Sequence, residues 1–194
     1  MKYSILHRKE RLIITTIEII DELGIQGLST REIARRQDIS EGALFRHFRS
    51  KNELLLAVLE YFSEFDNDIF QSTKLKNLRP RDAIIYLINS HVEYYENYPA
   101  ITSILLNLDV LRYETELTDK VDNIIEKRTG YLKELVDLAQ QEGEIRPDVN
   151  GDNIPDIIFG FFIMICLEWK ISKRKFSLKE KILSTLIQVM DSFG

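Results

Sequence analysis

The sequence contains little of what disulfides, frequent turns or secretion require. It has one cysteine, 4 prolines and 8 glycines among 194 residues. A single cysteine excludes an internal disulfide and points to a reducing cytoplasm. So few turn-forming residues favour long helices. No basic-then-apolar leader opens the chain, so we do not expect secretion. These absences predict a cytoplasmic and mainly helical protein.

Patterns typical of catalysis and metal binding are also absent. The histidines His7, His47 and His91 lie far apart in sequence and have no metal-ligand spacing, either with each other or with Cys166. There is no glycine-rich phosphate loop and no nucleophile elbow. Cys166 lies in an apolar run, which indicates an inert core thiol. We therefore expect no enzymatic activity, no cofactor and no bound metal.

An uncharged apolar run from Ile157 to Leu167 is too short for a membrane span. The run has 11 residues between Asp156 and Glu168, whereas a transmembrane helix needs about 20. We expect no membrane partner.

Charge is distributed unevenly along the chain. The net charge is −5, but residues 1–51 contain ten Lys/Arg and seven Asp/Glu, which gives +3. Residues 52–194 contain 16 Lys/Arg and 24 Asp/Glu, which gives −8. A basic head on an acidic body suits a protein that contacts phosphates with one end only.

The stretch Ser29–Lys51 predicts two short helices joined by a turn. Ser29 is a favourable N-cap, and Glu32, three residues later, completes a capping box. Asp38 lies in the turn and can adopt the left-handed conformation there. Ser40 caps the second helix. The residues of that helix expected to face inward are Leu44, Phe45 and Phe48. This layout is a helix-turn-helix, in which the second helix enters the major groove of DNA.

These residues resemble the DNA-binding domain of the TetR family of bacterial transcriptional repressors. The matching positions are Ser29, Ile33, Ala34, Ser40, Gly42, Leu44, Phe45, His47, Phe48, Lys51 and Leu54. Two positions depart from the family pattern. Phe45 replaces a tyrosine and lacks the hydroxyl that can bond a phosphate, and Gln37-Asp38 replaces Ala-Gly. The resemblance implies an all-α fold of about nine helices. A three-helix helix-turn-helix head would occupy residues 1–51, and a helical ligand-binding and dimerisation body would occupy residues 52–194.

The resemblance also implies a DNA interface on the head. Its predicted residues are Ser29, Thr30, Arg31, Ser40, Glu41, Gly42, Ala43, Phe45, Arg46, His47 and Lys51. Gly42 and Ala43 would leave the exposed face of the helix without protruding side chains, so that the helix can approach base edges closely. The alternative is that these small residues fill a tight contact between helices. His47 is either a phosphate contact, as its counterpart is in the family, or a core histidine. Lys51 either adds its charge to a helix N-terminus that attracts phosphate or lies in solvent.

The basic start of the chain, Met1–Arg11, leaves two interpretations open. It is an arm that touches the DNA backbone, as in the family, or a solvated terminus.

The body sequence predicts helices over residues 52–70, 81–98, 100–112, 114–141, 153–171 and 178–193. The last two are apolar on so many sides that one chain cannot cover them, because an apolar helix must be buried on more than one side. We therefore predict a four-helix dimer interface built from both copies of these helices. Its predicted residues are Ile158, Phe161, Ile165, Ile182, Leu186 and Val189. The alternative is a single core that lies wholly inside one chain.

Three polar residues interrupt the apolar stripes of the body. Because a buried charge is costly unless it is paired, His91, Arg128 and Glu168 each need a protein partner or a ligand. The resemblance implies a small-molecule pocket in the body. The residues predicted to line it are His91, Tyr95, Arg128, Phe162 and Glu168. Such a pocket would take an apolar ligand with one polar or anionic end. A structural ion pair or a snorkelling arginine is the alternative at each position.

The sequence therefore predicts a ligand-responsive transcriptional repressor. It would bind a palindromic double-stranded DNA operator as a homodimer and would be released by a small apolar or amphipathic effector of unknown identity. One alternative is an activator or co-repressor-dependent regulator of the same fold. Another is a protein-interaction module without a specific DNA target.

Overall fold

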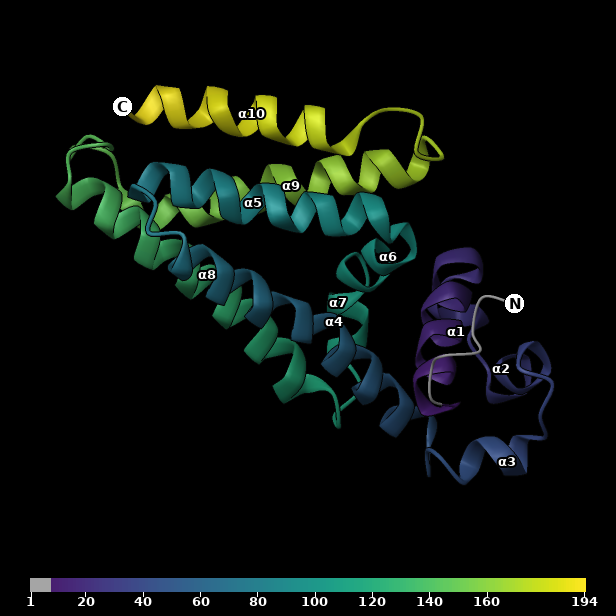
Figure 1. Cartoon of the computed structure of the whole chain (residues 1–194). Helices are drawn as coiled ribbons and strands as arrows, with labels where there is room; N and C mark the ends of the chain where they lie inside the picture. Colours follow the sequence, from purple (N-terminus) through teal and green to yellow (C-terminus); the bar gives the residue numbers. More distant parts are fainter. Residues whose placement is uncertain (1–7) are drawn as a thin grey trace. The chain divides into compact units, whose positions relative to one another are not determined.

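The computed structural model describes residues 8–194, which form helices joined by short loops (Figure 1). The helices are α1 (Arg8–Leu23), α2 (Thr30–Arg36), α3 (Glu41–Phe45), α4 (Lys51–Leu75), α5 (Pro80–Asn97), α6 (Thr102–Leu105), α7 (Leu108–Arg112), α8 (Thr118–Gln141), α9 (Ile154–Ile171) and α10 (Leu178–Phe193). The all-α prediction is confirmed, and residues 8–194 contain no strand. There are ten α-helices in this range rather than about nine, because the segment after Pro99 divides into α6 and α7. The predicted arm is Met1–Arg11, and its first seven residues lie outside the described range.

The chain divides into two compact units. The first contains the residues up to Glu64 together with Pro99–Asn123, and the second contains Phe65–Tyr98 together with Ile124–Gly194. The helices α4 and α8 each contribute residues to both units.

Side-chain caps fix the helix-turn-helix in the first unit. The Ser29 hydroxyl accepts a hydrogen bond from the Glu32 backbone N–H at 3.1 Å, and the Ser40 hydroxyl accepts one from the Ala43 N–H at 3.1 Å. Both N-caps are therefore confirmed. The second half of the predicted capping box is not, because the Glu32 carboxylate accepts hydrogen bonds from Arg35 and Arg36 instead.

The head agrees with the prediction for Asp38 and corrects the one for Phe45. Asp38 has φ 51°, the left-handed conformation expected in the turn. Leu44 and Phe48 are fully buried, whereas Phe45 is 42% exposed. Each helical residue turns the side-chain direction by about 100°, and Phe45 therefore leaves the face that Leu44 occupies.

In the second unit, α10 packs along α5 and α9 (Figure 1). The Ser177 hydroxyl caps α10 by accepting from the Glu180 N–H at 3.1 Å, and the Glu96 carboxylate of α5 accepts from the Lys179 N–H at 3.0 Å. The C-terminal part of α4 packs on α5, where the Phe65 and Tyr94 rings stack 3.8 Å apart. These contacts hold the last helix on the body core.

Most of the predicted dimer residues on α9 and α10 are buried within one chain. Those fully or almost fully buried within one chain are Ile158, Ile165, Ile182 and Leu186. Phe161 and Val189 are half-buried. The exposed apolar side chains of α9 instead include Ile157, Met164 at 53% and Ile171 at 72%. Because α9 is apolar on all sides, its periodicity could not tell the inner face from the outer one.

Candidate DNA interface and effector site

The first unit presents α2 and α3 on one exposed surface. The Thr30 hydroxyl at the start of α2 donates a 2.6 Å hydrogen bond to the Glu41 carboxylate at the start of α3. Gly42 is exposed, and a Cβ placed there would meet nothing closer than the Ser40 hydroxyl at 3.9 Å. The start of α3 is thus anchored to α2, and its surface is low enough for close approach by a large partner.

Only one of the two small residues predicted on the exposed face of α3 lies there. Ala43 is turned inward and only 8% exposed, so Gly42 alone keeps the exposed side of α3 low. His47 is half-buried, which is compatible with both of its predicted roles.

Several cations of the helix-turn-helix region are exposed. Arg31, Arg46 and Lys51 are exposed. Arg35 and Arg36 are instead paired with Glu32, and hydrogen bonds from Arg35 and then Arg36 lower the pKa of this carboxyl to about 2. The exposed cations that remain available to a phosphate include Arg31 of α2, Arg46 after α3 and Lys51 at the start of α4.

The start of α4 is capped by its own neighbours. The Ser50 hydroxyl accepts from the Glu53 N–H at 3.0 Å, and the Glu53 carboxylate accepts from the Arg49 N–H at 2.6 Å. A phosphate near this helix N-terminus would therefore depend on the Lys51 ammonium group more than on the Glu53 N–H.

A buried polar cluster connects three helices of the second unit. Asp66 of α4 accepts hydrogen bonds from Arg128 of α8, from Nε at 2.8 Å and from Nη2 at 2.7 Å. His91 of α5 lies 3.3 Å from the same carboxylate through Nε2, and its Nδ1 lies 2.9 Å from the Leu87 carbonyl oxygen. The Arg128 Nη1 donates to the Tyr95 hydroxyl at 3.2 Å. All four side chains belong to residues at most 7% exposed. We name this set, Asp66, His91, Tyr95 and Arg128, the core cluster.

The electrostatics of the core cluster favour the ionised carboxylate. Burial alone would raise the pKa of Asp66, but the positive charge of Arg128 and the hydrogen bonds from His91 and Arg128 outweigh it and lower the pKa to about 2. Burial raises the pKa of the Cys166 thiol to about 12, as expected for an inert core thiol. The buried arginine is thus matched by a buried carboxylate.

The structure brings most of the predicted pocket residues together. His91, Tyr95 and Arg128 meet in the core cluster, and the Phe162 ring lies edge-on to Tyr95 at 5.8 Å. Glu168 does not join them, because its side chain is 42% exposed and pairs with Lys181 of α10.

Sequence reasoning missed Asp66, although its spacing carried a signal. Asp66 lies four residues after Phe62 and three before Ile69, on the buried stripe of α4. An acidic residue at that spacing predicts a buried partner of opposite charge.

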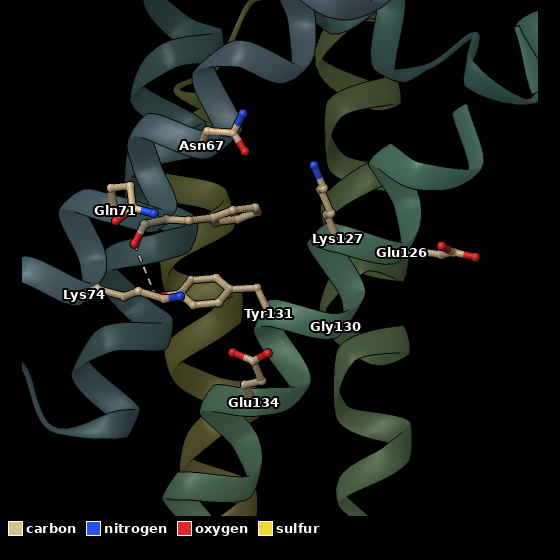
Figure 2. Close-up of a pocket in the computed structure, with 9 residues that line it drawn as sticks. Asn67, Gln71, Lys74, Glu126, Lys127, Gly130, Tyr131 and Glu134 are labelled. Atoms are coloured by element: carbon tan, nitrogen blue, oxygen red, sulfur yellow. Dashed lines mark hydrogen bonds between the residues drawn. The ribbon is translucent and has the colours of Figure 1, made fainter. Parts of the chain in front are cut away.

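An open groove of about 330 Å³ lies beside the cluster between α4 and α8. Its lining residues are Asn67, Phe70, Gln71, Lys74, Glu126, Lys127, Gly130, Tyr131 and Glu134. Figure 2 shows Lys127 extending into the space between the two helices and Glu126 pointing away from it. The Phe70 ring lies 4.6 Å from Tyr131 and 6.3 Å from His91, so it separates the groove from the core cluster. We name this feature the α4–α8 groove.

Residues 8–194 contain neither a metal-binding cluster nor a membrane span. No group of His, Cys, Asp and Glu side chains there is placed to hold a metal ion. No helix in the same range combines the length and the apolar character needed to cross a membrane.

Comparison with known families decides the identity of both halves. The profile of bacterial regulatory proteins of the tetR family matches residues 12–58, and that of the YsiA-like protein C-terminal region matches residues 59–190. The chain belongs to the TetR family of bacterial transcriptional regulators. TetR-family proteins are DNA-binding regulators and not enzymes.

Individual TetR-family relatives are distant. The nucleoid occlusion factor SlmA of Haemophilus ducreyi is 26% identical over 121 residues, which cover 62% of this chain and 60% of SlmA. The fatty acid degradation regulator FadR from Bacillus halodurans has a similar fold, with a TM-score of 0.78, 18% identity and coverage of 93% of this chain and 96% of FadR. FadR from Bacillus subtilis, solved in complex with stearoyl-CoA, also has a similar fold. Its TM-score is 0.76 and its identity 19%, and the match covers 91% of this chain and 96% of FadR.

The core cluster predicts an acid-dependent loss of stability. We expect Asp66→Asn to lower the free energy of unfolding by about 3 kcal/mol near neutral pH, because it leaves a buried cation without its counter-charge. The folded pKa of Asp66, about 2, lies below its ordinary 3.8. Its contribution is therefore present above about pH 4 and is lost as pH falls towards about 2. Urea unfolding across that range should show the difference between wild type and variant shrinking.

The control is Asp68→Asn, because Asp68 is exposed two residues away and its removal should leave the unfolding curves unchanged. A difference between wild type and Asp66→Asn that stays constant down to the lowest pH would contradict the assignment.

Proposed function

We propose that this TetR-family regulator is a repressor that binds a palindromic operator as a homodimer and leaves it when a small amphipathic ligand binds the second unit. The observation that carries the proposal is the exposed face of α3. Gly42 leaves this face without a protruding side chain, and the nearby residues Arg31, Arg46 and Lys51 are exposed. A low helix with cations nearby fits a major groove between two phosphate backbones.

Dimerisation is supported by the outer face of α9. Ile157, Met164 and Ile171 recur every seven residues and are exposed, so they form an apolar stripe along the helix. Gly160 lies within the stripe, and a Cβ added there would meet no atom within 4 Å. A stripe of this kind on a surface helix favours packing against a second helix. The partner best matched to it is the same stripe of a second copy, related by a twofold axis.

Ligand control is supported by the core cluster and by one structural relative. The FadR of Bacillus subtilis was solved with stearoyl-CoA, an amphipathic acyl compound. In this chain, Arg128 and Tyr95 offer polar groups beside Phe162, which suits a ligand with one polar end. For release, the ligand must favour the arrangement that does not fit DNA, and a coupling of about 1–3 kcal/mol is typical.

A selection of genomic fragments tests the function directly. The purified full-length protein is mixed with sheared genomic DNA, and the bound fragments are sequenced. We expect discrete fragments that share an inverted repeat, with half-site centres about 34–36 Å apart or a multiple of that spacing. A library recovered without enrichment would refute the operator. A direct repeat would refute the twofold arrangement.

The position of α3 in the groove is tested by Gly42→Glu. The side chain would project where no protein atom lies, so the fold should survive, whereas a carboxylate facing DNA should reduce operator affinity by about 100-fold or more. Gel shift measures the affinity, and circular dichroism checks the fold. Gly130→Glu introduces the same charge on α8 and serves as the control. Wild-type affinity in Gly42→Glu would remove α3 from the groove.

The phosphate role of Lys51 is tested by salt dependence. If each subunit loses one phosphate contact, Lys51→Ala should flatten the slope of log affinity against log salt by about 0.9 per subunit. Operator and random DNA should weaken alike. Lys175→Ala, an exposed lysine of the second unit, should leave the slope unchanged. A Lys51→Ala slope equal to that of wild type would show that Lys51 lies in solvent.

The α9 stripe is tested by Met164→Glu. Because Met164 is exposed in the single chain, the substitution should preserve the fold and produce monomers in analytical ultracentrifugation. Leu138→Glu changes a residue of α8 that is similarly exposed and should remain dimeric. A dimeric Met164→Glu protein would place the interface elsewhere. Ile182→Glu, at a fully buried position, should unfold the body instead.

A further inference from the structure

Arg128 already binds a carboxylate, and that carboxylate belongs to α4. Two Arg128 nitrogens donate to the two Asp66 oxygens at 2.7 and 2.8 Å. This two-bond geometry is the one with which arginine recognises carboxylates in general. The same pair of donors would serve a carboxylate that enters on a small molecule.

We propose that the effector is a carboxylic acid whose carboxylate replaces Asp66 on Arg128. This inference rests on the proposed function, because it names the polar end of the ligand and the contact that the ligand breaks. The exchange keeps the buried guanidinium paired, whereas removal of Asp66 without a substitute would strand it. Asp66 moves into water with α4, and α4 thereby loses its polar link to α5 and α8.

The surroundings of Arg128 select a compact anion. The site lies in a core where each residue of the cluster is at most 7% exposed, so the head group must fit the volume of the aspartate carboxyl it replaces. The Nε2 of His91, which lies 3.3 Å from the Asp66 carboxylate, would face the incoming anion in the same position. A neutral alcohol offers Arg128 no charge and a single oxygen. A carboxylate meets every requirement that Asp66 meets.

The tail of the acid has apolar neighbours and a route. Phe162 lies edge-on to Tyr95, and Cys166 is buried on the same helix, α9. On the opposite side, Phe70 lies between His91 and the α4–α8 groove. Lys127 extends into that groove (Figure 2), and the Lys74 ammonium lies 5.3 Å from the centroid of the Tyr131 ring. An anion drawn to the lysines reaches Arg128 once the Phe70 side chain changes rotamer.

The experiment measures ligand binding to the full-length protein without DNA. The probes are octanoate, dodecanoate and hexadecanoate, each paired with the primary alcohol of equal chain length, and affinities come from calorimetry. We expect at least one acid to bind about tenfold or more tightly than its alcohol. We expect Asp66→Asn to bind that acid about tenfold more tightly than wild type, because the competing charge is gone. The same variant should leave the affinity for the alcohol nearly unchanged.

Three results would overturn the proposal. They are no binding by any acid, equal binding of acid and alcohol, and weaker acid binding in a folded Asp66→Asn protein. The double variant Asp66→Asn, Arg128→Gln retains hydrogen-bonding groups without charge and should lose the preference for the acid. Asp68→Asn, which changes an exposed carboxylate of α4 outside the groove lining, is the matched control and should keep the preference. If Asp66→Asn fails to fold, the comparison of acid and alcohol in wild type still decides.

Failure of this proposal differs from failure of the proposed function. A protein that selects an operator but binds none of the acids refutes the carboxylate exchange and leaves the DNA-binding function intact. A protein that prefers acids through Arg128 but enriches no DNA supports the exchange and refutes the operator.

Discussion

The second unit depends on one buried ion pair, Asp66 with Arg128. Each charge would be costly alone in a core of this kind, and each is tolerable because the other is within hydrogen-bonding distance. The pair joins α4 to α8, while His91 and Tyr95 bring α5 into the same network. Neither helix can leave the cluster unless the remaining charge finds another partner. The arrangement therefore has two stable solutions, the present pair or a substitute for one member, and few intermediates between them.

The location of Asp66 on α4 gives this constraint its functional meaning. The helix begins at Lys51, in the unit that carries α3, and continues without a break to Leu75. A helix is held by consecutive backbone hydrogen bonds, so Asp66 and Lys51 belong to one continuous hydrogen-bonded element. The coupling needed for regulation is about 1–3 kcal/mol, and truncating one member of a buried charge pair costs about 3–5 kcal/mol. The cost of breaking such a pair is therefore of the size that the proposed regulation requires.

Local features were predictable from the sequence, and tertiary choices were not. The Ser29 and Ser40 caps, the left-handed Asp38 and the bounds of α10 follow from interactions within a few residues of each other. The outer face of α9 could not be predicted from the sequence, because a helix that is apolar on all sides has no polar side to mark the solvent. Ala43 and Phe45 exchanged their expected environments, since α3 is only five residues long and its orientation is set by the helices beneath it.

The candidate effector site shows the same division between local and tertiary information. Sequence reasoning found His91 and Arg128 because each interrupts an apolar stripe, and the structure joins them. It included Glu168 for the same reason, although that side chain pairs with Lys181 at the surface. Periodicity identifies a polar residue on a stripe, but only the fold decides whether a long side chain reaches solvent. Asp66 would have distinguished the buried Arg128 from the surface residue Glu168. Its short side chain cannot reach water from the buried stripe of α4, so it needs a buried cation as partner. A short acidic residue on a buried stripe is therefore the stronger indicator of a core ion pair, and its presence on α4 puts the candidate effector site on the helix that begins at Lys51 in the first unit.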